Sequence, residues 1–233
     1  MIYRYRALDL FCGAGGSTKG LQRAGFHVTG VDNRAQPRYP GDEFYRADAL
    51  EFCAARGREY DLIAASPPCQ FASEATPMPY RSRHPNMIPA VRLALQATGR
   101  AYIIENVENA RKHLVSPVML CGSMFGLGVW RHRYFELSFP PMLTPPCNHS
   151  QSPVTLVKAG SNSRKARRLP VLITGTTRRL YANGGRFEFT ADECRKASGL
   201  YWMTRAEMDQ AIPPAYMEFI GRHFIAYLER LRA

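Results

Sequence analysis

The feature that most constrains the fold is a regular alternation of short apolar segments with helical segments. An expected strand over Tyr5–Leu10 leads into a glycine-rich turn and a helix that begins at about Ser17 and ends at Gly25. A second strand is expected over His27–Val31. This alternation is typical of a doubly wound, mostly parallel sheet, in which ligands bind at the carboxyl ends of the strands. We therefore expect an α/β fold whose chemistry lies in the loops that follow the strands.

The same pattern continues to about residue 137 and then stops. Strands are expected over Asp61–Ala65 and Ala101–Glu105, with a helix over Met87–Thr98 between them. From about Ser138 the chain is rich in Pro, Ser, Thr, Asn and Arg, with one apolar strand expected over Pro170–Thr174. We predict a main domain over 1–137 and a small irregular lobe over 138–186.

Helical signals return in the last 47 residues, 187–233. Thr190 with Glu193, and Thr204 with Glu207, have the spacing of capping boxes. The segment from Pro213 to Leu231 has apolar residues at helical spacing, with proline at its start. We expect these helices to return to the main domain.

Positive charge is concentrated in one stretch. The formal net charge is +12, and the 51 residues from 137 to 187 carry +8 of it without a single acidic residue. The basic residues of this stretch are Lys158, Arg164, Lys165, Arg167, Arg168, Arg178, Arg179 and Arg186. A solvated charged surface would also give this composition, but a compact basic patch favours contact with a nucleic-acid backbone.

Composition excludes several classes of protein. Hydrophobic residues make up 45% of the chain and charged residues 21%, as in ordinary globular proteins. No apolar run approaches the roughly 20 residues that span a bilayer, and the first residues lack the apolar core of a signal peptide. Six cysteines occur without a CxxC pair, which disfavours a disulfide framework. We expect a cytoplasmic protein with no membrane partner.

The first candidate site is the turn Asp9–Gly16 (DLFCGAGG), directly after the first strand. Glycines at such a turn let backbone N–H groups approach a ligand. Asp32 ends the second strand, where an acid can hold the ribose of a nucleotide-like cofactor. Nicotinamide, flavin and S-adenosylmethionine all fit this pattern. The absence of the third glycine of the dinucleotide fingerprint disfavours a pyrophosphate ligand.

Three other motifs supply candidate catalytic groups. Cys69, in Ser-Pro-Pro-Cys-Gln, follows a strand on a turn that proline makes rigid, which suits a nucleophile better than core packing. Glu105 closes another strand and is followed by Asn-Val. Arg131 and Arg133 form an Arg-x-Arg pair that can orient a polar substrate. The carboxyl ends of neighbouring strands meet at one edge, so Cys69 and Glu105 are expected to face one crevice.

Some residues are not expected to carry chemistry. Cys147 and His149 have metal-binding side chains, but two ligands without a second pair favour a solvated turn, so we expect no metal. Cys12 is expected to pack beside the glycine-rich turn. His132 and His223 are expected to lie at the surface.

The ordered set DLFCGAGG, SPPCQ, ENV and RxR-x-F resembles the C5-cytosine DNA methyltransferase family. Two later segments, FTADEC from Phe189 and QAIPP from Gln210, also resemble that family. The resemblance extends from Leu8 to about Leu228 with the motifs in the family's order. It implies a Rossmann-like catalytic domain, S-adenosylmethionine as cofactor, and a compact enzyme like those of phages and prophages.

For the cofactor, the resemblance implies that Phe11, Gly13 and Gly15 line the pocket. It further implies that Asp32 holds the ribose and that Asp48 contacts the adenine amine.

For catalysis, the resemblance implies that Cys69 attacks C6 of a flipped-out cytosine, with the Pro68 carbonyl contacting the base. Glu105 is expected to hold N3 and the exocyclic amine. Arg133 is expected to contact O2, with Arg131 supporting the loop.

The lobe over 138–186 is expected to recognise double-stranded DNA. The residues expected to contact DNA are Arg164, Lys165, Arg167, Arg168, Arg178 and Arg179. We expect a monomer in a bacterial or phage-infected cell. Three alternatives remain open: a methyltransferase acting on RNA, an inactive homologue that binds DNA or a partner, and a folate-dependent enzyme acting on a free pyrimidine nucleotide.

Overall fold

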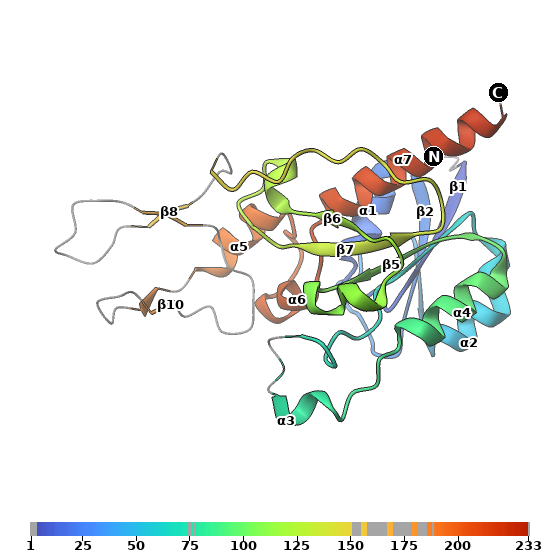
Figure 1. Cartoon of the computed structure of the whole chain (residues 1–233), viewed down its shortest axis with the longest axis horizontal. Coiled ribbons are helices and arrows are strands. Elements are labelled where there is room, and N and C mark those ends of the chain that lie inside the picture. The colour runs from blue at the N-terminus through green and yellow to red at the C-terminus, as the bar shows by residue number, and fades with distance from the viewer. Residues whose placement is uncertain are drawn as a thin grey trace.

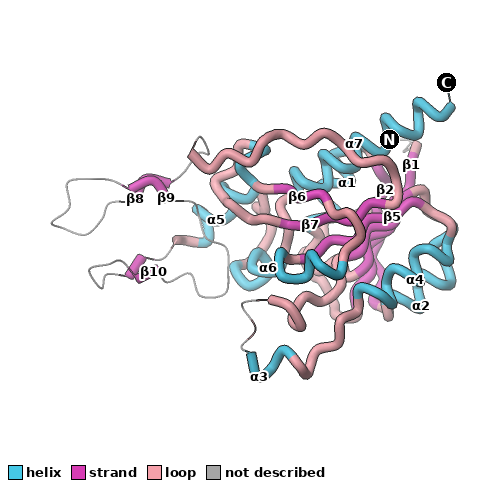
Figure 2. Tube along the Cα trace, in the orientation of Figure 1, coloured by secondary structure: helices cyan, strands magenta, loops and turns pink. Residues whose placement is uncertain are grey.

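The structure is a computed structural model that describes residues 4–73, 76, 78–150, 155–157, 167–169, 179–180, 186–187 and 189–232. Its centre is a seven-stranded sheet in the order β3-β2-β1-β4-β5-β7-β6 (Figures 1 and 2). The strands are β1 (Tyr5–Leu10), β2 (Phe26–Asp32), β3 (Glu43–Arg46), β4 (Leu62–Ala65), β5 (Ala101–Asn106), β6 (Val118–Leu120) and β7 (Arg133–Leu137). Together with the flanking helices, this sheet makes the fold α/β, as the sequence predicts.

The pairing of the strands shows how the sheet is wound. β1 pairs in parallel with β2 and β4, β2 with β3, and β4 with β5. β7 runs antiparallel to both β5 and β6. The start of β7 therefore lies beside the carboxyl end of β5, which matters for the site described below.

Helices cover both faces of the sheet (Figure 1). The helices are α1 (Gly16–Ala24), α2 (Ala49–Arg56), α3 (Met78–Arg81), α4 (Ile88–Thr98), α5 (Ala191–Ser198), α6 (Arg205–Gln210) and α7 (Pro214–Arg232). Short 3-10 turns occupy Gly57–Glu59, Glu108–His113 and Gly122–Phe125.

Alternating residues of β1 divide the core into two apolar layers. Leu8 and Leu10 are fully buried in a cluster that includes residues of α2 and α4. Tyr5 and Ala7 belong to the opposite cluster, which includes residues of α1 and α7. This division follows from the two-residue period of a strand whose two faces are both covered.

Helices α1 and α7 approach each other closely at Gly20. A Cβ atom at Gly20 would clash with the carbonyl oxygen of Pro214 and would lie 2.7 Å from Cβ of Met217. The last helix therefore packs on the first, which brings the end of the chain back to β1 and β2.

Most boundaries of the expected elements are confirmed within one or two residues. Gly25 and Gly99 end α1 and α4 in the left-handed conformation, at φ of 109° and 66°. The Thr190 box is present, because the Thr190 N–H donates to Glu193 Oε2 at 2.7 Å and the Glu193 N–H donates to Thr190 Oγ1 at 3.2 Å. The Thr204 N–H likewise donates to Glu207 at 2.7 Å.

Other expectations were incomplete or remain untested. Strands β3, β6 and β7 were not predicted, because they are short and lack a long apolar run. The strand expected over Pro170–Thr174 lies outside the described residues. Between residues 138 and 187 the structure describes two antiparallel ribbons, β8 (Thr155–Val157) with β9 (Arg167–Leu169) and β10 (Arg179–Leu180) with β11 (Arg186–Phe187). The division of the chain at residues 137 and 186 stays a prediction.

None of the helices in the described ranges is long and apolar enough to cross a membrane.

Candidate active site

Three of the predicted motifs meet at the carboxyl edge of the sheet because of strand register. Ala65 of β4 pairs with Ile104 of β5. The start of the Ser66–Cys69 loop and Glu105 therefore lie at the same level along the sheet. Glu105 in turn pairs with Phe135 of β7, two residues after Arg133. Parallel pairing places the first two motifs together, and the reversed direction of β7 adds the third.

The loop that carries Cys69 is fixed by backbone contacts. The Asn106 side chain donates to the carbonyl oxygen of Pro67 at 3.0 Å. The Cys69 carbonyl accepts from the backbone N–H groups of Ala72 and Ser73 at 2.9 and 2.8 Å. The loop is thus held from both sides, and the side chain of Cys69 stays half-buried.

The surroundings of Cys69 favour the neutral thiol in this state. Burial raises its pKa, and the nearby Glu105 carboxylate raises it further. The Arg133 guanidinium acts in the opposite direction. Because Glu105 and Arg133 have opposite effects on the thiolate, any change in charge at Glu105 alters the reactivity of Cys69.

Glu105 and Arg133 form a nearly buried ion pair. Arg133 Nε lies 3.1 Å from Glu105 Oε1, with the side chains 14% and 10% exposed. Burial raises the pKa of Glu105, while Arg133 and a hydrogen bond from Ser66 lower it. Burial has the largest effect, so the carboxyl group holds a proton more readily than an exposed glutamate would.

Arg131 is buried behind the ion pair and connects two segments. One of its Nη atoms donates to the backbone carbonyl of Asp209 at 2.6 Å. The Tyr216 hydroxyl donates to the Arg131 carbonyl, also at 2.6 Å. Burial, followed by the repulsion of Arg133, lowers the pKa of Arg131 to about 9. Arg131 therefore joins the Arg-x-Arg loop to the end of α6 and to α7. The supporting role expected of Arg131 stays a prediction.

The glycine-rich turn has a strained backbone and open space beside it. Phe11 and Gly13 have φ of 57° and 49°. Apart from the chain neighbours of Gly13, no atom of the described residues lies within 4 Å of a Cβ placed on it. The Gly13 N–H donates to Asp32 Oδ2 at 3.0 Å, and the Arg34 N–H donates to Asp32 Oδ1 at 2.9 Å. Each carboxylate oxygen keeps a second lone pair for a ligand hydroxyl.

These residues fit a cofactor that carries a ribose. The Asp32 carboxylate is oriented by backbone donors, and Phe11 is a partly exposed aromatic ring beside the open turn. Beneath the turn, Asp9 Oδ1 is buried with no hydrogen-bond partner in the described part of the chain. Gly15, at φ of 80°, is buried against Pro40.

Asp48 has a structural role in addition to the one expected for it. It is the N-cap of α2, and its Oδ1 accepts from the N–H groups of Leu50 and Glu51 at 2.8 and 3.0 Å. The side chain is exposed, and both bonds end on one oxygen, so Oδ2 can still accept from a ligand amine.

The sequence did not reveal several residues whose contacts hold the site together. Tyr216 lies in the predicted closing helix and Asn106 in the Glu-Asn-Val motif, but their tertiary contacts leave no trace in the sequence. Trp202 donates to the carbonyl of Ala14 at 2.7 Å and so connects the segment after α5 to the glycine-rich turn. Cys12, expected to pack beside the turn, is buried there.

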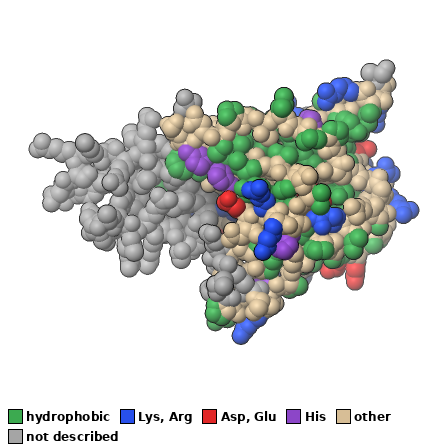
Figure 3. All heavy atoms as spheres, in the orientation of Figure 1, with side chains coloured by type: hydrophobic (Ala, Val, Ile, Leu, Met, Phe, Trp, Pro, Cys, Tyr) green, Lys and Arg blue, Asp and Glu red, His purple; other side chains and the backbone are tan. Residues whose placement is uncertain are grey.

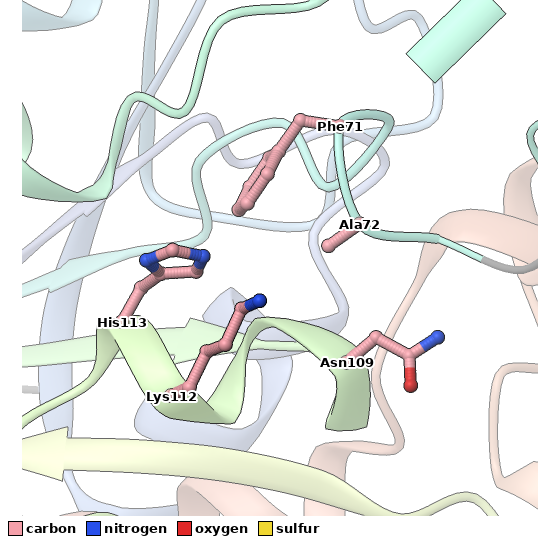
Figure 4. A pocket seen from close by; sticks show the side chains of 5 residues that line it. All are labelled: Phe71, Ala72, Asn109, Lys112 and His113. Atoms are coloured by element: carbon pink, nitrogen blue, oxygen red, sulfur yellow. The ribbon is translucent and has the colours of Figure 1, made fainter. Parts of the chain in front are cut away.

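A hollow of about 480 Å³ lies beside the Cys69 loop (Figure 4). It is lined by Phe71, Ala72, Asn109, Lys112 and His113. The Phe71 and His113 rings meet edge to face with centroids 5.5 Å apart. In Figure 4 the side chains of the 3-10 turn after β5 face the loop that follows Cys69, so this hollow adjoins the candidate site.

The residues expected to contact DNA are only partly described. Arg167 and Arg168 lie in β9, and Arg179 begins β10. Arg164, Lys165 and Arg178 lie outside the described residues. The ribbons lie beyond α5, far from the two termini (Figure 1).

Comparisons with known proteins agree with this fold. Residues 5–119 match the family model for the C-5 cytosine-specific DNA methylase. The type II methyltransferase M.NgoMIV of Neisseria gonorrhoeae is 28% identical over 147 residues, which cover 56% of this chain and 46% of that protein. The match therefore spans about half the length of this curated relative.

Solved structures share the whole fold at low sequence identity. A protein described as a DNA modification methyltransferase encoded within an E. coli prophage has a TM-score of 0.58 and 15% identity, covering 97% of this chain and 99% of that one. The Dnmt2 methyltransferase of S. pombe has a TM-score of 0.55 and 16% identity, covering 98% and 99%. The Entamoeba histolytica methyltransferase EhMeth has a TM-score of 0.57 and 12% identity, covering 96% and 98%.

Proposed function

We propose that this chain, whose residues 5–119 match the family model for the C-5 cytosine-specific DNA methylase, transfers a methyl group from S-adenosylmethionine to C5 of cytosine in double-stranded DNA. The observation that carries this proposal is the placement of Cys69, Glu105 and Arg133 at one edge of the sheet. A thiol, a carboxyl group that holds a proton, and a guanidinium are the three groups that this reaction requires.

The chemistry begins with the weakness of cytosine as a nucleophile at C5. Addition of the Cys69 thiolate to C6 moves electron density onto C5, provided that N3 is protonated or strongly hydrogen-bonded. Glu105 can supply that proton because burial raises its pKa. Arg133 can stabilise the charge that develops on O2 of the base.

The bound cofactor would supply an electrophilic methyl group. Once C5 has taken it, a base removes the C5 proton, and the electron pair of that bond expels the Cys69 thiolate from C6. A cytosine stacked in a duplex is out of reach, so it must leave the stack at a cost of a few kcal/mol. Phe11, Gly13 and Asp32 would hold the cofactor beside Cys69.

The test uses purified protein, labelled S-adenosylmethionine and plasmid DNA. Wild type should label DNA, and Cys69→Ser should abolish labelling while cofactor affinity changes little. Cys53→Ala, which alters a buried cysteine in α2, serves as the matched control and should remain active. DNA that contains 5-fluorocytosine should trap wild type covalently, because no C5 proton is available for elimination.

The outcomes separate this proposal from the alternatives. Undiminished labelling by Cys69→Ser would contradict the assignment of the nucleophile. Labelling of RNA in place of DNA would move the substrate to RNA while keeping the thiolate chemistry. Absence of labelling on both nucleic acids would favour an inactive homologue.

A further inference from the structure

Four metal-binding side chains converge from segments that are distant in sequence. Cys121 follows β6, His132 immediately precedes β7, and Cys147 and His149 lie on the segment that follows β7. The two sulfur atoms and two imidazole nitrogens all lie within 4.8 Å of one another. Cys121 is buried and Cys147 is exposed, so the cluster extends from the core to the surface. Figure 3 shows histidine side chains gathered together on one face of the molecule.

The distances agree with those of a tetrahedral zinc site. Zn–N bonds of about 2.0 Å and Zn–S bonds of about 2.3 Å place the ligand atoms of a tetrahedron about 3.3–3.8 Å apart. The two Nε2 atoms of His132 and His149 are 3.3 Å apart. Cys147 Sγ lies 3.6 Å from His132 Nε2 and 3.2 Å from His149 Nε2, and Cys121 Sγ lies 3.3 Å from His149 Nε2.

The surroundings orient the ligands. The Trp130 ring stacks on His149, with centroids 4.1 Å apart and an interplanar angle of 5°. Ser123 Oγ lies 3.3 Å from the sulfur of Cys121 and 3.5 Å from that of Cys147, where it can donate to a thiolate. Partners of this kind fix the orientation of metal ligands and are typical of built metal sites.

We propose that Cys121, His132, Cys147 and His149 bind one Zn²⁺ ion. Two thiolates and two neutral imidazoles are the ligand set that zinc prefers, and their charge of −2 neutralises the ion. Four protein ligands leave no open position for a substrate, so the site is structural and not catalytic.

The position of the ligands indicates what the metal would hold. His132 lies between Arg131 and Arg133, so a metal bond to His132 would fix the loop that orients the Glu105 ion pair. Cys147 and His149 lie near the end of the described range 78–150, which precedes the ribbons β8–β9 and β10–β11 in the chain. Zinc would therefore hold that segment against β6 and the Arg-x-Arg loop.

This proposal replaces the expectation that the protein has no metal. That expectation depended on Cys147 and His149 having no second pair of ligands. Cys121 and His132 are the second pair, and β7 separates them in sequence from Cys147 and His149. The resulting spacing of C-x10-H-x14-C-x-H differs from the paired spacings that mark zinc fingers.

The test measures the metal, so its result does not depend on the proposed methyl transfer. Wild type purified after growth with zinc and passed over a chelating resin should retain about one zinc ion per chain by mass spectrometry. Cys147→Ser with His149→Gln should retain almost none. The control Cys53→Ala with His84→Gln, which removes the same residue types elsewhere, should retain as much as wild type.

Cobalt gives a second readout. Metal-depleted wild type titrated with Co²⁺ should develop the visible bands of a tetrahedral, thiolate-bound ion at one equivalent, and zinc should displace them. If the double variant fails to fold by circular dichroism, Cys147→Ser alone replaces it, because that side chain is exposed. Wild type that loses its zinc on the resin, or binds Co²⁺ no more tightly than the variant, would overturn the proposal.

Discussion

At the scale of single residues, two opposing effects on the pKa of Glu105 determine the properties of the candidate site. Burial favours the protonated carboxyl group, whereas Arg133, at 3.1 Å, favours the carboxylate. The proposed reaction uses both effects, since the carboxyl group must give a proton to N3 and then be stabilised without it.

Replacing Glu105 with Gln keeps the shape of the side chain but removes its acidity. The single-turnover rate of methyl transfer should fall by more than roughly 10²-fold, the lower range for lost acid catalysis. Duplex binding, measured by fluorescence anisotropy, should change little. Glu108→Gln, three residues later at the start of the 3-10 turn, is the control. If Glu105→Gln keeps a rate near that of wild type, another residue must supply the proton.

The raised pKa of Asp9 predicts how the stability of the folded protein depends on pH. Burial raises its pKa from 3.8 to about 7. Between these values the folded protein holds a proton that the unfolded chain has released, so this residue stabilises the folded state at low pH. Its contribution is lost as pH rises toward 7. Wild type should therefore lose about 2–3 kcal/mol of unfolding free energy from Asp9 between pH 5 and 8.

The variant Asp9→Asn isolates this effect. It keeps an acceptor for the Thr18 hydroxyl, which donates to Asp9 at 2.6 Å, but it cannot ionise. Urea unfolding at pH 5 and pH 8 should show a smaller loss of stability in the variant than in wild type. Equal losses in the two proteins would show that Asp9 ionises as readily folded as unfolded.

At the scale of elements, the Arg-x-Arg loop is held by the closing helix. Tyr216 of α7 is fully buried, and its hydroxyl donates to the Arg131 carbonyl. Tyr216→Phe should lower the unfolding free energy by about 1–3 kcal/mol, because it leaves a buried carbonyl without its donor. Thermal unfolding provides the measurement, with Tyr227→Phe on the same helix as control. A Tyr216→Phe melting temperature equal to that of the control would show that the hydrogen bond contributes nothing.

The elements also show what sequence reasoning can recover. β1 and α1 were predicted closely because apolar alternation and a terminal glycine are local signals. β7 was not predicted, although it determines where Arg133 lies, because its pairing with β5 is a non-local contact. The same limit applies to the cluster of Cys121 and His132 with Cys147 and His149, whose two pairs lie on either side of that strand. Cys69, Glu105 and Arg133 could be proposed from the sequence because each lies in a motif, and their roles stay predictions. Tyr216 and Trp202 act only through tertiary contacts.

At the scale of the whole molecule, positive charge is concentrated in residues 137–187 and is sparse in the rest of the chain. The residues outside 137–187 carry a net charge of only +4. A lobe of 49 residues, 138–186, has room for few base contacts, and most contacts of basic side chains with DNA go to phosphates. We therefore expect a short target of about two to four base pairs, which bisulfite sequencing of DNA from expressing cells would identify. A strict six-base site would contradict this expectation.

Affinity for DNA should depend steeply on salt, because each phosphate contact releases a bound counterion. Arg167→Ala with Arg168→Ala, in β9, should weaken binding to all sequences and reduce the slope of log K against log salt by about one to two units. Arg230→Ala with Arg232→Ala removes the same charge from the end of α7, far from the ribbons (Figure 1). Filter binding from 50 to 200 mM salt, a range over which phosphate contacts change affinity by orders of magnitude, compares the two pairs. If both pairs of substitutions change the slope equally, net charge and not residues 138–186 determines the binding of DNA. If neither pair changes the slope, the phosphate contacts lie elsewhere.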